Sequence, residues 1–323
     1  MKVYGFGEVL LRFTPPNYIQ LKDAQQLDIN VGGAELNALS TLAQFGHATE
    51  MITTLPEHAL GQHVLQEMRR TQVGTQWVQQ TAGRLGTYYM EEGFGHRSGQ
   101  VIYDRAYSTF AQQTSHLLEN VAGSKGDYFV FTGITLAVNH TIREHIVSYL
   151  QQLKEQGITI VFDINFRSNL WTLEEAVPVI KAVLPLVDIL FFGKKDATHL
   201  LQTNAESDDM HTCAQTLQQK FNIPFLASSN RSITQSTLQG IALTPDGFIE
   251  SAAYPYTVLN RIGAGDAFLA GVIHGLEAQW SLTTTLDFAT KCSVLQHTTQ
   301  EDALHLAEAD ILNLPEHFGE LKR

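Results

Sequence analysis

The chain switches repeatedly between two patterns of apolar residues. Short apolar runs bounded by turn residues are typical of strands buried on both faces, and they occupy residues 3–6, 49–53, 128–132, 159–163, 189–192 and 224–227. Longer segments with apolar residues at helical spacing lie between them, at residues 34–45, 60–72, 141–156, 173–186 and 210–221. This alternation predicts an α/β fold with a mostly parallel sheet covered by helices on both faces.

Two segments depart from this alternation. Residues 11–31 are polar and contain Pro15-Pro16, and residues 85–108 have the pattern of a hairpin with strands 86–92 and 100–106. We expect both segments to form a small β-sheet that projects from the main domain. Such a sheet suits a lid that excludes water from a reaction, a surface that joins two copies of the chain, or both. The predicted division is a core of residues 1–10, 32–84 and 109–323 and a lid of residues 11–31 and 85–108.

The most informative motif is the turn that ends in Asp266, with the sequence Asn-Arg-Ile-Gly-Ala-Gly-Asp. Its small residues Gly263, Ala264 and Gly265 allow a tight turn in which several N–H groups point the same way. Residues 267–276 follow with helical spacing, so the positive end of a helix faces this turn. Asp266 then places a carboxylate beside a phosphate-sized hole, which suits phosphoryl transfer.

This motif alone leaves other interpretations open. Gly263 and Gly265 resemble the start of a dinucleotide-binding fingerprint, but the third glycine would fall on Phe268, which is too bulky for close helix packing. A plain helix N-terminus with an aspartate in its first turn also fits. The rest of the chain has to decide between these interpretations.

Composition narrows the class of protein. The 323 residues are 44% hydrophobic and 17% charged, which allows one large domain and a smaller one. The net charge of −12 argues against nucleic-acid binding, although a few arginines and oriented N–H groups can still attract an anionic ligand. Cys213 and Cys292 offer no metal spacing or disulfide framework. With no signal-like or membrane-length apolar segment, we expect a cytoplasmic protein without membrane contact.

Two motifs in this order carry a family resemblance. With the segment from Gly32-Gly33 to Asn37 near the start and the turn at Gly263 to Asp266 near the end, the chain resembles the ribokinase-like (PfkB-type) sugar kinases over residues 7 to 302. Within that family it is similar to the 2-keto-3-deoxygluconate kinases. That closer match lies in residues 6–12 with Pro15-Pro16, residues 103–106, Asp163-x-Asn165-x-Arg167 with Leu170-Trp171, and His297-Thr298 with Asp302.

The resemblance implies a doubly wound α/β domain with a small β-sheet lid that often joins dimers. It also implies phosphorylation of a sugar hydroxyl that depends on ATP and magnesium. In this interpretation Asp266 is the catalytic base, and the backbone at Gly263, Ala264 and Gly265 is the anion hole.

The expected substrate residues come from three places. Gly32 and Gly33 would let the backbone approach a polyhydroxy ligand, and Asn37 would bind the ligand or hold the loop. The side chains of Tyr103 and Arg105 share one face of a strand, and Tyr89 on the neighbouring strand is a further candidate for the same pocket.

Two arginines bear on the kind of sugar. Arg167 follows the strand 159–163 at the sheet edge where α/β proteins bind ligands. Guanidinium groups bind carboxylates bidentately, so Arg105 and Arg167 together favour an acidic sugar over a neutral one. A surface ion pair is the alternative for each arginine.

The nucleotide side matches the family less well. Where relatives carry Asn-x-x-Glu, this chain has Lys194-Lys195-Asp196-Ala197, and residues 228–231 replace a glycine-containing loop. Lys194, Ser228 and Arg231, with Gly263 and Gly265, are the candidate nucleotide-binding residues. Asp163 and Asn165 are indirect magnesium ligands at most, or cap a turn, and no direct metal ligand is assigned.

Taken together, these features predict an ATP-dependent sugar-acid kinase that acts on the 6-hydroxyl of 2-keto-3-deoxygluconate or a close analogue. The expected partners are the sugar acid, ATP and Mg²⁺, with a homodimer formed through the lid sheet. A fructokinase or ribokinase is one alternative. A non-catalytic sugar-acid sensor with a degenerate nucleotide site is the other, because the segments near Lys194 and Ser228 are altered.

Overall fold

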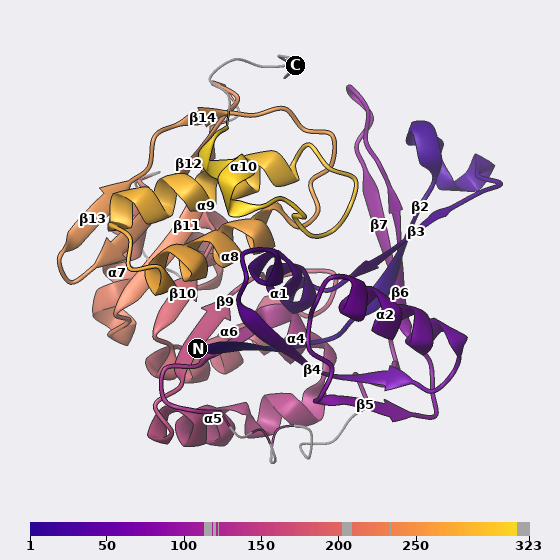
Figure 1. The fold of residues 1–323 in the computed structure, drawn as a ribbon, viewed down its shortest axis with the longest axis horizontal. Coiled ribbons are helices and arrows are strands. Elements are labelled where there is room, and N and C mark those ends of the chain that lie inside the picture. The colour runs from indigo at the N-terminus through magenta and orange to yellow at the C-terminus, as the bar shows by residue number, and fades with distance from the viewer. Residues whose placement is uncertain (113–117, 119–120, 122, 202–208, 233, 315–323) are drawn as a thin grey trace.

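A large sheet between two layers of helices forms the body of the protein, in a computed structural model that describes residues 1–112, 118, 121, 123–201, 209–232 and 234–314 (Figure 1). Its strand order is β13-β12-β11-β10-β9-β8-β1-β4-β5, and β14 pairs with β12. The strands are β1 (Lys2–Phe6), β4 (Ala48–Pro56), β5 (Val78–Thr81), β8 (Tyr128–Thr132), β9 (Thr159–Asp163), β10 (Ile189–Phe191), β11 (Phe225–Ser232), β12 (Thr237–Thr244), β13 (Gly247–Glu250) and β14 (Tyr254–Pro255).

The helices follow the strands as a doubly wound fold requires. They are α1 (Ala34–Gln44), α2 (Ala59–Arg70), α4 (Gly133–Val138), α5 (His140–Glu155), α6 (Leu173–Val183), α7 (Met210–Phe221), α8 (Ala264–Glu277), α9 (Leu282–Gln296) and α10 (Glu308–Leu312). Short helical turns occur at Pro16–Tyr18, Leu21–Asp23, Leu184–Leu186 and Asp196–Leu200.

The centre of the sheet is parallel and buried. Strands β4, β1, β8, β9, β10 and β11 pair in parallel, and all five residues of β8 are buried. Successive side chains of β8 enter different hydrophobic clusters. Phe129 belongs to the cluster that includes residues of α5, among them Tyr149, whose ring centroid lies 5.7 Å away, whereas Val130 belongs to the cluster that includes residues of α1 and α8. Apolar side chains on both faces explain the continuous apolar runs in the sequence. The predicted α/β class, with all six expected strands and all five expected helices, is confirmed.

A second sheet stands apart from the core, at the right of Figure 1. It has the order β3-β2-β6-β7, with β2 at Leu10–Thr14, β3 at Asp28–Gly32, β6 at Gly86–Glu91 and β7 at Gln100–Asp104. Strands β6 and β7 are the predicted hairpin, and β2 and β3 are the two ends of the polar segment that follows β1. The separate small sheet is therefore confirmed, and we call these four strands the lid sheet.

Several elements were not predicted. The antiparallel edge strands β12 and β13 and the helix α9 extend the core beyond the parallel region. Within the described part of the chain, no helix has both the length and the apolar character needed to cross a membrane.

Candidate active site

The turn before α8 has the backbone geometry that its glycines predict. Gly263 is the N-cap of α8 with φ of +77°, a left-handed conformation that favours glycine. A Cβ atom at Gly263 would lie 1.9 Å from the carbonyl oxygen of Asp302, so only glycine fits. Gly263 and Gly265 line a cavity of about 540 Å³, which we call the main cavity. Ala264 is buried behind the turn and does not line it.

Asp266 lies in the first turn of α8 and faces the main cavity. Its Oδ2 accepts a hydrogen bond of 2.8 Å from Nδ2 of Asn37. Burial raises the pKa of Asp266 to about 7, and the neighbouring charge of Glu35 adds to this, whereas the Asn37 bond lowers it. A carboxyl group with a pKa near neutrality is suited to general base catalysis at physiological pH.

Of the two glycines before α1, Gly33 lines the main cavity and Gly32 does not. Gly33 and Asn37 line the cavity, as the sequence predicts. Gly32 does not line it: a Cβ atom there would come within 2.4 Å of Oδ2 of Asp302, so Gly32 leaves room for that carboxylate. The direct partner of Asn37 is Asp266, which favours the interpretation that Asn37 holds the site in place.

The lid sheet contributes two tyrosines to the main cavity, and one of them differs from the prediction. Tyr88 and Tyr103 are paired across β6 and β7 and both line the cavity. Tyr89 points to the opposite face of the sheet and stacks on Phe13, with ring centroids 5.4 Å apart. Because side chains alternate along a strand, the expected pocket residue moves from Tyr89 to Tyr88.

Arg105 lines the main cavity, but its charge is already paired. Its Nη2 lies 2.6 Å from Oε2 of Glu8, and its Nε donates to the same oxygen at 2.7 Å. Both side chains are buried, with exposed fractions of 8% for Arg105 and 1% for Glu8. Ser108 donates a hydrogen bond to the other oxygen of Glu8. Arg105 and Arg167, which were expected to bind the ligand in the same way, therefore differ, because the guanidinium of Arg105 is already paired with the carboxylate of Glu8.

Arg167 is the more accessible of the two arginines. It is exposed and lines the main cavity together with two adjoining cavities of about 440 Å³ and 290 Å³. Its positive charge lowers the pKa values of three carboxyl groups around the site, which burial raises, namely those of Asp163, Asp196 and Asp266. Arg167 is thus close to the acidic groups as well as to the solvent-filled space.

The cavity of about 290 Å³ continues from the main cavity along the ends of β9, β10 and β11. Both cavities are lined by Asp163, Asn165, Arg231 and Gly265, and the smaller one also by Ser228. Burial, with the charges of Asp266 and Asp196, raises the pKa of Asp163 to about 8. The backbone N–H of Asn165 donates to Oδ1 of Asp163 at 3.2 Å, so Asp163 caps this turn while facing both cavities.

The altered segment after β10 presents an acid to the cavities. Asp196 lines the 290 Å³ cavity and accepts a 2.7 Å hydrogen bond from the backbone N–H of Gly193. Lys194 lines none of the cavities described here, and Lys195 lines only the 440 Å³ cavity. In this segment it is Asp196, at the start of the helical turn Asp196–Leu200, and not Lys194 that lines the 290 Å³ cavity, and a nucleotide contact of Lys194 stays a prediction.

Sequence reasoning assigned no role to several polar side chains of the main cavity. These side chains share the cavity with Asp266 and come from five separate segments: Glu8, Tyr88, Asn169, Arg261 and Asp302. Arg261 directly precedes the glycine turn, and Glu8 and Asp302 fall in segments of the family match, so position in the motifs was the available signal. Among the described residues, no group of three or more His, Cys, Asp or Glu side chains is arranged to hold a metal ion.

The chain is similar to known proteins along most of its length. A model of the family described as "pfkB family carbohydrate kinase" matches residues 2–307. The chain is 28% identical to a 2-dehydro-3-deoxygalactonokinase of Haloferax volcanii over 297 residues, which cover 92% of this chain and 91% of the relative.

Two solved structures are also similar along nearly the whole chain. A PfkB family carbohydrate kinase from Listeria grayi superimposes with a TM-score of 0.88 at 33% identity, covering 96% of this chain and 98% of the other. A 2-dehydro-3-deoxygluconokinase from Thermotoga maritima superimposes with a TM-score of 0.89 at 28% identity, covering 97% and 98%.

Proposed function

The chain belongs to the pfkB family of carbohydrate kinases, and on this premise we propose that it transfers the γ-phosphoryl group of ATP to the 6-hydroxyl of 2-keto-3-deoxygluconate or a close analogue. The observation that carries the proposal is Asp266, held by Asn37 beside the glycine turn, in a cavity that Arg167 also lines. The named activities of the Haloferax and Thermotoga relatives, both on 2-dehydro-3-deoxy sugar acids, support the substrate class.

The proposed reaction uses Asp266 as the base. Its carboxylate accepts the proton of the sugar hydroxyl as that oxygen forms a bond to the γ-phosphorus. The bond between the γ-phosphorus and the bridging oxygen breaks, and ADP leaves with the electron pair. Backbone N–H groups at Gly263, Ala264 and Gly265 stabilise the charge on the transferred group, supported by their place at the positive end of α8.

The acidic end of the sugar is assigned to the part of the main cavity that Arg167, Arg105 and Tyr103 line. Arg167 is the principal partner of the carboxylate, because its guanidinium is exposed and faces the cavity. Arg105 and Tyr103 complete this wall, with Arg105 held in place by Glu8. A neutral sugar has no group that requires Arg167, so this wall favours a sugar acid.

The phosphates of the nucleotide are assigned to the 290 Å³ cavity and its opening into the main cavity. Ser228, Arg231, Gly263 and Gly265 lie along this path. Arg231 and Arg261 both face the main cavity, and neither has an acidic partner within 4 Å among the described ion pairs. Two such guanidinium groups suit a polyphosphate.

Magnesium fits the same region as an ion shared with the nucleotide. The charges of Asp266 and Asp196 both act on Asp163 and contribute to its raised pKa. Carboxylates in such a position can hold Mg²⁺ through water without forming a complete protein cage. When bound, the ion would neutralise charge on the phosphate oxygens.

An ADP-release assay over sugar acids and neutral ketoses tests the proposal. We expect turnover on 2-keto-3-deoxygluconate, and Asp266→Asn is expected to reduce kcat by about 10²- to 10⁴-fold. Asp246→Asn, on the exposed turn between β12 and β13, is the matched control and keeps full activity. Full turnover by Asp266→Asn would rule out the assigned base.

Calorimetry separates the kinase from a non-catalytic sensor. A kinase binds both the sugar acid and magnesium–ATP, whereas a sensor binds the sugar acid alone. Preference for a neutral ketose would instead indicate a fructokinase or ribokinase.

The lid sheet is also proposed to join two copies of the chain. Four side chains are adjacent across its four strands on the face opposite the cavity, because Ile29 pairs with Phe13, Phe13 with Tyr89, and Tyr89 with Ile102. Ile29 is 54% exposed and Ile102 is 45% exposed. A continuous apolar row on an open sheet face suits a self-complementary interface in a homodimer.

A further inference from the structure

Asp302 lies where the lid sheet meets the turn before α8. Its carboxylate Oδ1 accepts hydrogen bonds from Nε of Arg12 at 2.9 Å and from Nη2 of Arg12 at 2.6 Å. Its Oδ2 accepts a longer bond, 3.4 Å, from the hydroxyl of Tyr88. Gly32 leaves the space that this carboxylate fills. Strands β2, β6 and β3 of the lid sheet therefore surround one side chain of the C-terminal loop.

The backbone of the same loop supports the glycine turn. The carbonyl oxygen of Asp302 lies against Gly263, at the place where a side chain of residue 263 would begin. Nε2 of the buried Gln296 donates to the carbonyls of both Ile262 and Glu301, at 3.1 Å and 2.7 Å. The turn and the loop at residues 301–302 are thus bonded to one another.

Arg12 binds this loop by more than one group. In addition to the Asp302 carboxylate, its Nη2 donates to the carbonyl of Gln300 at 2.8 Å, and its Nη1 donates to Thr14 at 2.7 Å. The exposed fractions of the Arg12 and Asp302 side chains are 3% and 2%. A buried pair with several hydrogen bonds fixes the geometry of its two elements more strictly than an exposed pair.

We propose that Arg12 is a positioning residue, which acts through Asp302 to set the distance between the lid sheet and the glycine turn at Gly263. Tyr88 and Tyr103, the two tyrosines by which the lid sheet lines the main cavity, would then be held at a constant distance from Asp266. The catalytic consequence rests on the proposed kinase function, whereas the structural coupling does not.

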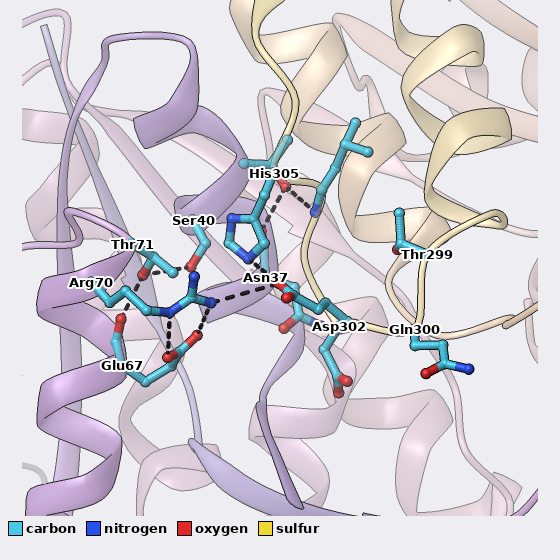
Figure 2. A network of polar contacts seen from close by, with 12 residues as sticks. Asn37, Ser40, Glu67, Arg70, Thr71, Thr299, Gln300, Asp302 and His305 are labelled. Atoms are coloured by element: carbon cyan, nitrogen blue, oxygen red, sulfur yellow. Dashed lines mark hydrogen bonds and ion pairs between the residues drawn. The ribbon is translucent and has the colours of Figure 1, made fainter. Parts of the chain in front are cut away.

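The same loop offers a matched control. Figure 2 shows Arg70 and Glu67 of α2 beside the loop that carries Asp302 and His305. Arg70 lies 3.6 Å from the carboxylate of Glu301, next in sequence to Asp302, but the exposed fractions of this pair are 56% and 52%. Removal of Arg70 therefore breaks an arginine–carboxylate pair on the same loop but leaves the hydrogen bonds that Asp302 accepts from Arg12 and Tyr88 in place.

Amide hydrogen exchange tests the coupling independently of any activity. In Arg12→Met, the hydrogen-bonded amides of Ile262 and Ala267, at the two ends of the glycine turn, are expected to exchange about tenfold faster or more, because the loop behind the turn loses its anchor. In Arg70→Met those amides keep their wild-type rates. If Arg12→Met fails to fold, Arg12→Lys serves in its place. Lysine keeps the charge but cannot donate two hydrogen bonds to Asp302 as Arg12 does, so a smaller increase in the exchange rate is expected.

Kinetics tests the consequence for catalysis. With the sugar substrate that the wild type turns over, Arg12→Met is expected to lower kcat/KM by about 10²-fold, whereas Arg70→Met stays within about twofold. Asp302→Asn and the double variant should lose about as much as Arg12→Met alone, because the two residues act as one unit. The proposal would be overturned if the folded Arg12 variant had the same amide exchange rates and the same kcat/KM as Arg70→Met. An inactive wild type would refute only the proposed kinase function, and hydrogen exchange would still decide the coupling.

Discussion

Asp266 is a carboxyl group whose protonation depends on a few neighbours. Burial shifts its pKa toward neutrality, and the hydrogen bond from Asn37 opposes that shift by stabilising the ionised form. As the proposed base, Asp266 must be ionised to accept a proton. The proposed turnover at acidic pH is therefore sensitive to Asn37, a residue that need not touch the reacting atoms.

We predict that Asn37→Ala moves the acidic limb of the kcat/KM profile to higher pH. Loss of the donated hydrogen bond raises the pKa of Asp266, so a smaller fraction of the base is ionised at pH 6.5. Turnover should fall more at pH 6.5 than at pH 9. Ser40→Ala, on the same helix but bonded to Thr71, is the control and should leave the profile unchanged. A uniform loss at every pH would contradict this role for Asn37.

Arg167 is the residue on which the proposed choice of an acidic sugar depends. We predict that Arg167→Met raises KM for the sugar acid by about 10- to 100-fold, the cost of losing hydrogen bonds to a charged group. KM for any neutral sugar that is turned over should change little. Arg84→Met removes an exposed arginine paired with Asp104 and is the control. Equal effects on acidic and neutral sugars would contradict the assignment.

At the scale of elements, the carboxyl ends of β9 and β10 and the start of α8 bring acidic groups together. Asp163 at the end of β9 has its pKa raised to about 8 by burial and by the charges of Asp266 and Asp196. Its pKa in the unfolded chain is near 3.8. The folded state therefore binds its proton more tightly than the unfolded state, and this stabilisation is lost as pH rises through about 8.

We predict that the ligand-free protein unfolds at a lower temperature at pH 9 than at pH 6. Asp163→Asn should raise the unfolding temperature at pH 9 by a few degrees, roughly what one kcal/mol yields in a large domain. The variant should gain much less at pH 6, where the wild-type group is already protonated. Asp246→Asn is the exposed control, and thermal scans at both pH values provide the measurement. An equal gain at both pH values would show that Asp163 is not the titrating group.

The elements also show what can be predicted from the sequence. Strands such as β8 and β9 are buried on both faces, so their apolar runs are continuous and easily identified. Helix α9 was missed because the polar Thr285, Thr290 and Ser293 are buried together with its apolar side chains, which weakens the usual contrast between faces. Tyr88 was missed because the pairing of β6 with β2 and β7, and not its own sequence, decides which face meets the cavity.

The contacts that complete the site join distant parts of the chain. Arg105 bonds to Glu8 across 97 positions, and Asn37 bonds to Asp266 across 229. Motifs identify the individual residues, but no local sequence pattern predicts that Arg105 is paired with Glu8. Residue types could therefore be predicted from the sequence, whereas their pairing required the fold.

At the scale of the whole molecule, the two faces of the lid sheet have different surroundings. One lines the main cavity, and the other presents the apolar row of Ile29, Phe13, Tyr89 and Ile102. We predict that Ile102→Lys converts a dimer to a monomer in sedimentation velocity, because charge on this row is costly to bury. Leu60→Lys, at a 44% exposed leucine of α2, is the control. A wild type that sediments as a monomer would contradict the interface.

The bond between Arg12 and Asp302 spans 290 positions, from the second strand of the chain to a loop near its end. During translation Arg12 is therefore made long before Asp302, and for that time its guanidinium has no Asp302 carboxylate to bind. We expect the spacing between the lid sheet and the glycine turn to be set only after both residues have left the ribosome.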